Sequence, residues 1–365
     1  MANDSPDSAS TPPGFPSAAP PQIIIQQPSQ QGLFGRLVKW LLAVMALMVA
    51  FFVATIFLFG VVAAVVNPDD GPREKYHSLA EQATKKIAII EVDGAILEGD
   101  GFVKKQIDRV RKDDDVVAVV LRIDSPGGTV TGSHYLYHHL RKLAEERKLP
   151  IVVSMGSVCA SGGYYIAMAV GDQPDAIFAE PTTWTGSIGV VIPHYDLSGL
   201  LGAWNVKDDS IASGPLKLMG SPTRPMTDEE RQVLQALVDE SFAGFKEIVI
   251  SGRPKFGDDP PALDAAATGQ IFTAKQALER GLIDKLGFVE DAIKRAAELS
   301  GHGTDELRCV KYAVPATLMG ELFGSQATAA RPAVLDLATW LDLTAPRAYY
   351  LWTWLPAILS NTPSQ

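Results

Sequence analysis

Residues 152–165 read VVSMGSVCASGGYY and decide how the rest of the chain is interpreted. The stretch begins with β-branched apolar residues, which favour a buried strand, and it ends in small and apolar residues that favour the start of a helix. Ser161 and Gly162 lie between the two parts. A tight turn from a strand into a helix exposes a side-chain hydroxyl and leaves backbone N–H groups free beside it. The sequence therefore predicts that Ser161 is a nucleophile.

The composition allows a large core and excludes several classes of function. Of the 365 residues 47% are hydrophobic, which is enough for one large domain or two. The net charge of −10 argues against nucleic acid as a partner. The two cysteines, Cys159 and Cys309, are too few for a disulfide framework or a thiolate metal cluster, and the six histidines follow no HExxH pattern. We expect no metal and no cofactor.

The N-terminal part predicts a tail and a membrane anchor. Residues 1–35 form a segment rich in Pro, Ser, Gln and Ala, which is typical of a disordered tail. From Trp40 to Val66 no residue is charged, and this run exceeds the roughly 20 residues that cross a bilayer as a helix. A cleaved signal peptide is the alternative, but its apolar core is usually about 7–15 residues long. We therefore expect a transmembrane helix that crosses the membrane once, over residues 36–67.

The charges beside this anchor predict its orientation. Arg36 and Lys39 precede the apolar run, whereas Asp69 and Asp70 follow it. By the positive-inside rule, the N-terminus then lies in the cytoplasm and the chain after the anchor lies outside it. Residues 68–85 have the composition of a polar linker.

The following part of the chain alternates between strand-like and helix-like segments. This βαβ rhythm predicts an α/β domain over residues 86–315, with a mainly parallel sheet and flanking helices. Thr227, with Glu230 three residues later, has the pattern of a capping box at the start of the longest helix. The expected strands are residues 87–92, 116–123, 151–154, 176–179, 188–192 and 307–314, and the expected helices are residues 103–111, 133–147, 197–204, 226–251, 262–268, 274–280 and 289–299.

Residues 316–365 are interpreted as a C-terminal tail. They hold one amphipathic segment, residues 334–343, and an aromatic patch, YYLWTW, at residues 349–354. The patch is too short to span a bilayer. It can pack on a neighbouring subunit, on the body of the domain, or at the membrane interface, where Trp and Tyr are favoured. The sequence leaves these three alternatives open.

Two kinds of side chain can activate Ser161. A histidine oriented by a carboxylate is the common one, and His194 with Asp196 is the nearest such pair, although a surface turn also explains it. The flanking sequence Cys-Ala-Ser-Gly-Gly is not the GxSxG pattern of α/β-hydrolases. The other activator is a lysine whose pKa is lowered by burial. Lys217 is a candidate because it stands alone among Gly, Leu and Met, but a lone surface lysine on a loop would look the same.

Glycine-rich turns supply candidates for an oxyanion site. Gly127 and Gly128 follow a buried strand and precede a helix, so their N–H groups can point into a cleft. The N–H of Gly162, directly after the nucleophile, is the second natural donor. Glycine after a strand is also the ordinary residue of a turn. A third turn, residues 183–189, offers hydroxyls that could hydrogen-bond a lysine amine.

Four motifs in this order resemble the signal peptide peptidase A family, over roughly residues 86–300. They are DSPGG at residues 124–128, ASGGYY at 160–165, TGSIGV at 185–190, and the stretch SGPLKLMGSP at 213–222. The family consists of membrane-bound bacterial serine–lysine proteases with a fold related to Clp protease and the crotonases. The resemblance therefore implies a Clp/crotonase-like domain, in the short form with one catalytic domain.

The resemblance also implies a role for each matching residue. Ser161 matches the nucleophile, Lys217 the general base, Gly128 and Gly162 the oxyanion donors, and Ser187 the hydroxyl that orients the lysine. The family further implies ring-like homo-oligomers in which serine and lysine can come from neighbouring subunits. One protomer therefore need not hold a complete dyad.

These inferences predict a serine endopeptidase anchored in the bacterial inner membrane, with its catalytic domain outside the cytoplasm. The resemblance implies peptide substrates, chiefly signal peptides left in the membrane after secretion, and the alternative is a quality-control peptidase for membrane proteins. A crotonase-like acyl-CoA enzyme is opposed by the outward topology, since CoA is cytosolic, and by Lys217. A catalytically inactive scaffold is opposed by the intact serine and lysine. The chain departs from the family in its N-terminal tail, at residues 171–175 and after about residue 315, which leaves assembly and regulation open.

Overall fold

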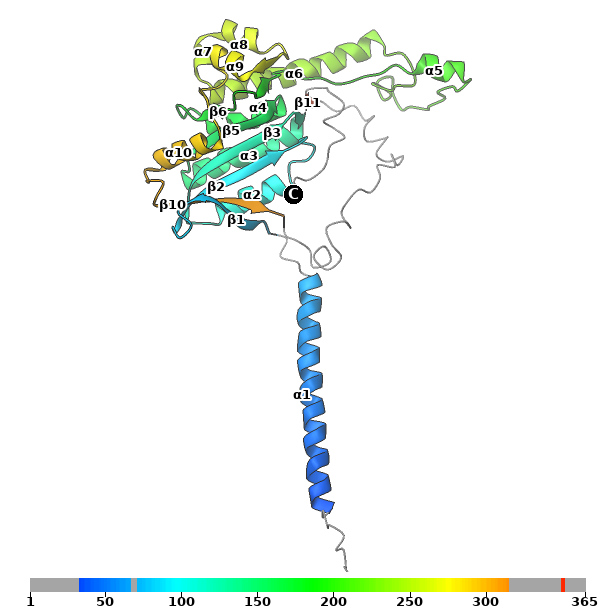
Figure 1. Cartoon of the computed structure of the whole chain (residues 1–365). Coiled ribbons are helices and arrows are strands. Elements are labelled where there is room, and N and C mark those ends of the chain that lie inside the picture. The colour runs from blue at the N-terminus through cyan, green and yellow to red at the C-terminus, as the bar shows by residue number, and fades with distance from the viewer. Residues whose placement is uncertain (1–32, 67–70, 315–348, 352–365) are drawn as a thin grey trace, which may run out of the picture. The chain divides into compact units, whose positions relative to one another are not determined.

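The computed structural model describes residues 33–66, 71–314 and 349–351. The chain divides into two compact units, residues 1–67 and 68–365. Helix α1 (Leu33–Val66), drawn in blue in Figure 1, belongs to the first unit. Within it, Gly35–Leu58 is the one stretch among the described residues that is long and apolar enough to cross a membrane.

The second unit is built on a largely parallel sheet, with nine strands among residues 71–314 (Figure 1). Strands β2 (Lys85–Asp93), β3 (Val116–Ser125) and β5 (Ile151–Ala160) lie side by side and parallel at its centre. They are almost continuously apolar because helices cover both faces of the sheet. The remaining strands of this sheet are β1 (Arg73–Leu79), β6 (Ile177–Ala179), β7 (Trp184–Gly186), β8 (Ile271–Thr273), β9 (Lys285–Leu286) and β10 (Leu307–Ala313). The strand order is β1-β10-β2-β3-β5-β6-β9, with β7 beside β5 and β8 beside β7.

Helices cover the two faces of the sheet with separate apolar clusters. Helix α10 (Val289–Ser300) covers one face, where its Ala292 and Ala296 pack in one cluster with Ile87 and Val152. The larger cluster on the other face includes buried residues of α2 (Phe102–Arg111), α3 (Val130–Arg147) and α4 (Gly162–Ala167). The short elements η1 (Met168–Val170), α7 (Lys255–Asp258), α8 (Pro260–Ala266) and α9 (Ala274–Arg280) complete this side.

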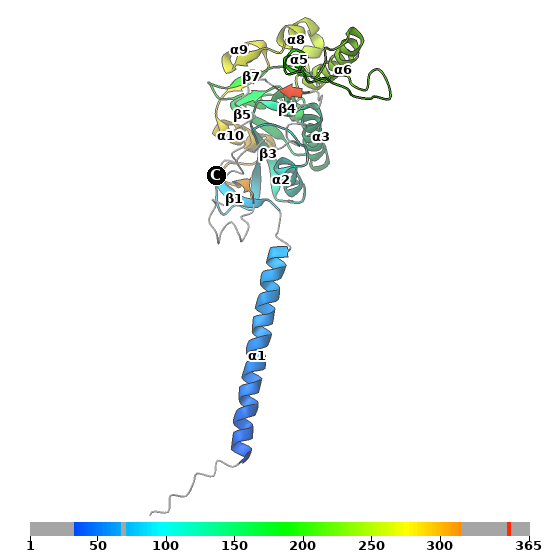
Figure 2. The ribbon, with the colours of Figure 1, turned by 90° about the vertical axis from the view of Figure 1, so that its right-hand side faces the viewer.

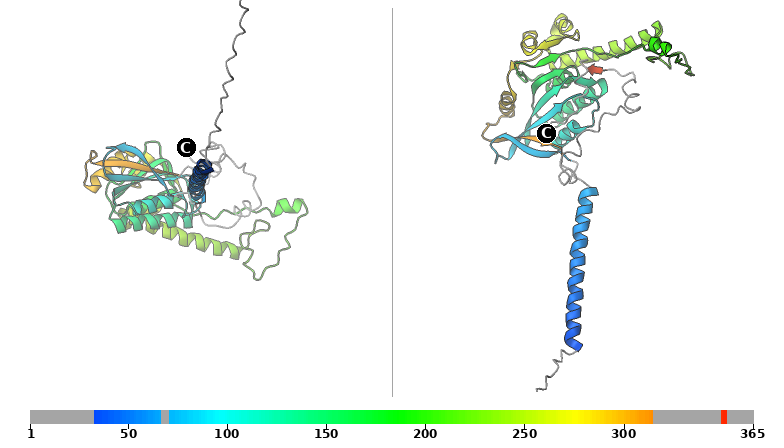
Figure 3. Two further views of the ribbon diagram at one scale, coloured as in Figure 1. Left: turned by 90° about the horizontal axis from the view of Figure 1, so that it is seen from below. Right: turned by 45° about the vertical axis from the view of Figure 1, so that its right-hand side comes forward.

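Helix α6 (Asp228–Gly252) carries an arm away from the body. Its C-terminal half is anchored by Phe245 and Val249, which are fully buried. Its N-terminal half extends beyond the body together with α5 (Ser198–Ala203) and the loop that follows α5 (Figures 1 and 3). The capping box of Thr227 and Glu230 is present at its start, as predicted. We call residues 192–227 the arm.

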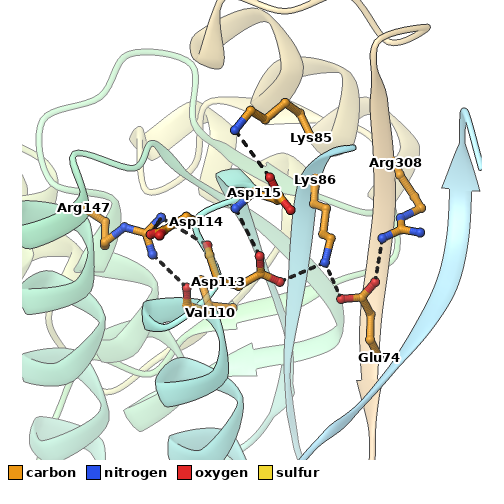
Figure 4. Close-up of polar contacts among 9 residues, drawn as sticks. All are labelled: Glu74, Lys85, Lys86, Val110, Asp113, Asp114, Asp115, Arg147 and Arg308. Carbon is orange, nitrogen blue, oxygen red and sulfur yellow. Dashed lines mark hydrogen bonds and ion pairs between the residues drawn. The ribbon is translucent and has the colours of Figure 1, made fainter. Parts of the chain in front are cut away.

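An ion-pair network closes the sheet at the β1 edge (Figure 4). The Nζ of Lys86 donates to Glu74 at 2.8 Å and to Asp113 at 2.9 Å, and Arg308 donates to Glu74 at 3.0 Å. Burial opposes the charge of Lys86, but the hydrogen bonds to the two carboxylates outweigh it and raise the pKa of this lysine. The network therefore joins the three strands β1, β2 and β10.

Two segments differ from the expected elements. Residues 73–79, which the composition assigned to a polar linker, form β1 and pair antiparallel with β10. Residues 188–192 contain only an isolated bridge position instead of a strand, and the strand lies earlier, at β7. Ile188 is buried in the core although it does not belong to a strand, so its apolar side chain does not indicate strand pairing. The amphipathic segment at residues 334–343 and nearly all of the predicted N-terminal tail lie outside the described residues.

Candidate active site

Ser161 lies at the junction of β5 and α4, as predicted, and its backbone is strained. Its φ of 55° and ψ of −114° lie in a region that a non-glycine residue adopts at a cost of about 1–3 kcal/mol. Its N–H donates to the Gly186 carbonyl at 2.8 Å, and its own carbonyl accepts from the N–H of Tyr165 at 2.8 Å. Strain of this kind persists where the surrounding structure holds it, and it is typical of a serine at a sharp strand-to-helix turn. The side chain itself is buried, with 1% of its surface exposed, and not exposed as the sequence predicted.

Gly128 and Gly162 adjoin each other beside this turn. A Cβ on Gly162 would lie 3.0 Å from the Gly128 nitrogen, so the backbones of the two predicted donors are in contact. Neither position has room for a side chain. A Cβ on Gly128 would lie 1.9 Å from the Ile96 oxygen, and a Cβ on Gly162 would lie 2.3 Å from the Ser133 Oγ. The structure thus brings together Ser161 and both glycines.

Strand β4 (Gly127–Thr129) fixes the position of the first donor. The N–H of Ile96 donates to the Gly127 carbonyl at 2.9 Å, and the N–H of Thr129 donates to the Ile96 carbonyl at 2.8 Å. Gly127 has a φ of 102°, which glycine adopts without strain. The Thr129 hydroxyl then caps α3 by accepting from the N–H of Gly132 at 3.0 Å. The turn is therefore tied down on both sides.

Asp124, the first residue of the DSPGG motif, positions the strand that leads to the nucleophile. Its carboxylate accepts from the N–H of Val158 at 3.1 Å and of Ser157 at 3.3 Å. The pairing of β3 with β5 shifts register between Ile123 and Ser125. Such an irregularity re-aims the residues that follow it. The sequence did not predict this role.

Ser187 is a second strained serine close to the first. Its φ is 51°, and its N–H donates to the Gln270 carbonyl at 2.7 Å. Strand β7 pairs parallel with the end of β5, so that Gly186 lies opposite Ala160. The residues that follow these two positions are Ser187 and Ser161. The two serines therefore leave neighbouring strands side by side, and both are buried.

Lys217 is not part of this cluster. It lies exposed in the arm, where its backbone N–H donates to the Gly214 carbonyl at 3.2 Å. The arm extends past the N-terminal end of α6, away from α4 (Figures 1 and 3). Among the described residues, no hydrogen bond joins Lys217 to Ser161 or to Ser187. One protomer of this structure therefore does not hold the predicted dyad together.

Arg224 ties the Lys217 segment to helix α6. Its guanidinium donates to the Leu218 carbonyl at 3.0 Å and to one carboxylate oxygen of Glu230 at 3.1 Å, and it also pairs with the other oxygen. The hydrogen bonds from Arg224 and from the Thr227 N–H lower the pKa of Glu230 to about 2. The capping-box pattern located Glu230, but no sequence signal pointed to Arg224.

The structure gives little support to a serine activated by histidine, to a reactive cysteine or to a metal site. The Nε2 of His194 faces the Ser221 carbonyl at 3.4 Å, and Asp196 accepts from the Ser198 N–H at 2.9 Å, so this pair serves the local structure of the arm. Burial raises the pKa of the Cys159 thiol, which keeps it protonated and unreactive. Within the described residues, no group of three or more His, Cys, Asp or Glu side chains is placed to hold a metal ion.

The start of the aromatic patch lies on the candidate site. Strand β11 (Tyr349–Leu351) pairs antiparallel with β4, with Tyr350 opposite Gly128 and Leu351 opposite Gly127 (Figure 2). It also contacts α3 and α4. Of the three alternatives for the aromatic patch, residues 349–351 therefore follow the second, because they pack on the body of the domain. Residues 352–354 lie outside the described part of the chain.

An open cavity of about 410 Å³ adjoins Ser187. One wall is the chain after Ser187, another is the exposed face of α6, and the third is the segment before β8. Its apolar lining includes partly buried valines and a phenylalanine, and one carboxylate lies among the lining residues. Its lining residues include Val190, Val191, Gln235, Val238, Asp239 and Phe242.

Several known proteins with similar sequences are named as proteases or peptidases. The pattern of peptidase family S49 matches residues 143–302, which include Ser161, Ser187 and Lys217. A protein of Synechocystis sp. named as a protease is 40% identical over 240 residues, which cover 66% of this chain and 83% of that protein. A protein of Enterococcus faecium named as a signal peptide peptidase is 34% identical (58% of this chain, 62% of that protein), and protease 4 of Salmonella typhi is also 34% identical (59% and 34%). The chain thus spans about a third of protease 4.

Proposed function

Because the chain belongs to peptidase family S49 and is a member of the signal peptide peptidase A family, we propose that this serine peptidase is a membrane-anchored endopeptidase with Ser161 as nucleophile and Lys217 as general base. The observation that carries the proposal is the strained backbone of Ser161 beside Gly128 and Gly162. Neither glycine position has room for a side chain, so their backbone amides lie close to the serine. A serine held in this way can attack a carbonyl whose oxygen is stabilised by both N–H groups.

The reaction proposed is acyl transfer through an ester on Ser161. The neutral amine of Lys217 takes the hydroxyl proton as the Ser161 Oγ attacks the scissile carbonyl carbon. The carbonyl oxygen becomes an oxyanion that accepts from the amides of Gly128 and Gly162. The C–N bond then breaks, and the proton passes from the lysine to the leaving amine. Water, deprotonated by the same amine, hydrolyses the ester and releases the second product.

We further propose that Lys217 reaches Ser161 from a neighbouring subunit. In one protomer the arm holds Lys217 outside the cluster of Ser161 and Ser187, and Arg224 keeps the lysine segment in a defined conformation. A ring of identical subunits places the arm of one copy against the body of the next. Ser187, whose position beside Ser161 is fixed by β7, then serves to orient the incoming amine.

The substrate is proposed to bind as an extended strand along β4. A strand that pairs with β4 presents its carbonyl groups to Gly128, next to Ser161. The chain's own β11 holds this position, because Tyr350 lies opposite Gly128. Main-chain pairing of this kind accepts many sequences, which fits a peptidase that degrades peptides. A substrate must displace β11 before it can be cleaved.

The apolar helix α1 supports the proposal of a membrane anchor, and the charges around it support an extracytoplasmic catalytic domain. A site outside the cytoplasm, on a chain anchored in the membrane, would meet cleaved signal peptides, which we propose as substrates. Peptides from damaged membrane proteins are the alternative, and the two differ in length and origin. Purified protein in vesicles, given either a released signal peptide or an intact membrane protein, separates them by which one is degraded faster.

The peptidase proposal is tested by the hydrolysis of an apolar peptide by the full chain in detergent. We expect Ser161→Ala and Lys217→Ala each to lower kcat by more than about 10³, because the nucleophile and its base act as a unit. Lys207→Ala, which removes another exposed lysine of the arm, is the matched control and should keep wild-type activity. Wild-type turnover by either active-site variant would refute the assignment.

The sharing of the dyad is tested by mixing the two inactive variants. In a ring assembled at random from equal amounts, half of the sites receive an intact serine and half of those receive an intact lysine, so about a quarter of the wild-type activity should return. If serine and lysine came from the same chain, mixing would restore nothing.

A further inference from the structure

The cavity beside Ser187 has one charged wall. Ser187 lines it and directly follows Gly186, whose carbonyl accepts from the N–H of Ser161, so the cavity lies next to the strand end beside the nucleophile, although Ser161 itself does not line it. Its lining is apolar at Val190, Val191, Val238 and Phe242. Each of these side chains is partly exposed, and together they offer apolar surface to a ligand.

Asp239 is the only charged residue among the described residues that line this cavity. It lies on the exposed face of α6, and the Nε2 of Gln235, one turn earlier, donates to its carboxylate at 2.8 Å. Lys246, two turns later on α6, is engaged elsewhere: its Nζ contacts Asp264 at 3.1 Å and lies 5.0 Å from the centre of the Phe242 ring. The Asp239 carboxylate therefore has no basic partner among the described residues.

A carboxylate at the rim of an apolar cavity matches a side chain with an apolar stem and a cationic end. Lysine and arginine have this build, since their methylene stems pack on apolar surface while the charged group stays near water. A purely apolar side chain would leave the carboxylate without a counter-charge, and an acidic one would be repelled by it.

We propose that this cavity is a substrate subsite that selects a lysine or arginine side chain near the scissile bond, with Asp239 as its specificity-determining residue. The proposal rests on the peptidase function proposed above, and it adds a sequence preference to it. A substrate strand along β4 passes Ser161 and turns one side chain toward this cavity. The apolar stem packs on Val238 and Phe242, and the cation pairs with Asp239.

The effect is of moderate size because Asp239 is exposed. Exposed ion pairs change a free energy by about 0.2–1 kcal/mol, so a lysine substrate should exceed its uncharged isostere by about 1.5- to 5-fold in kcat/KM. The preference should shrink as salt is raised from about 0.01 M to 1 M, where the screening length falls from about 30 Å to 3 Å. An apolar contact would not respond to salt in this way.

The test uses the full chain and a set of apolar peptides that carry lysine, norleucine or glutamate at each position around the scissile bond. We expect the wild type to prefer lysine over norleucine, and norleucine over glutamate, at one position. Asp239→Asn should remove this preference, and Asp239→Lys should invert it in favour of glutamate. The matched control is Glu240→Gln, which changes the net charge of the same helix equally but does not line the cavity.

Two results would overturn the subsite. One is a lysine-to-norleucine ratio that Asp239→Asn leaves at the wild-type value. The other is an equal change in Asp239→Asn and Glu240→Gln, which would show a general effect of net charge. Failure of the peptidase function itself looks different, because then no peptide is cleaved faster by the wild type than by Ser161→Ala.

Discussion

Gly128→Ala perturbs the oxyanion site at one defined atom. The new Cβ would lie 1.9 Å from the Ile96 oxygen, whereas ordinary contact begins at about 3.4 Å, so β4 or the Ile96 segment must move by about 1.5 Å. An oxyanion donor acts at about 2.7–3.1 Å, and a shift of this size removes the Gly128 N–H from its position. Losing one such donor lowers kcat by about 10²–10³, or about 2.7–4 kcal/mol.

The assay is kcat on one apolar peptide, measured well below the unfolding midpoint of each variant. Gly244→Ala in helix α6 is the matched control, because a Cβ there meets nothing within 4 Å. It should keep kcat and gain about 0.5–1 kcal/mol in stability, as expected for alanine in place of a helix-interior glycine. If Gly128→Ala folded normally and kept the wild-type kcat, the oxyanion role of this glycine would be wrong.

Three further predictions concern the parts around the site. The pKa of Glu230 is lowered to about 2 from 4.5, so its contribution to stability is present above pH 4.5 and is lost as the pH falls toward 2; the difference in Tm between the wild type and Glu230→Gln should shrink over this range. Tyr350→Pro removes a backbone N–H opposite Gly128 and weakens β11, where each hydrogen bond contributes about 0.5–1.5 kcal/mol, so kcat/KM should rise several-fold; an unchanged value would mean that β11 does not compete with substrate. Among the residues that the structure describes, the fully buried hydroxyl of Ser133 has no hydrogen-bond partner, and it lies against the Gly162 position, so Ser133→Ala should not lower Tm; a loss of stability would show that the hydroxyl is paired.

The central strands and helices followed from local patterns. The apolar run of β3 and the Thr227–Glu230 capping box are signals contained in a few neighbouring residues, and both elements are present in the structure. The turn at Ser161 was predictable for the same reason, since an apolar strand, a serine and two glycines succeed one another in the sequence.

Features that depend on distant partners were not predictable in this way. Strand β1 reads as polar because an edge strand faces water, and only its ladder with β10 and the Glu74–Lys86 pair make it part of the sheet. The pairing of β11 with β4 joins segments that lie far apart in the sequence. Arg224 has no local pattern, since its role comes from contacts with Leu218 and Glu230 that only the folded arm creates.

The role of Ser161 as the nucleophile is tested most directly by covalent labelling. The full chain in detergent is treated with a serine-reactive phosphonate, and the modified residue is located by mass spectrometry. We predict one label per chain, on Ser161, with a parallel loss of peptide hydrolysis and no label in Ser161→Ala. Labelling of a different serine, or hydrolysis that survives full modification of Ser161, would contradict the proposed mechanism.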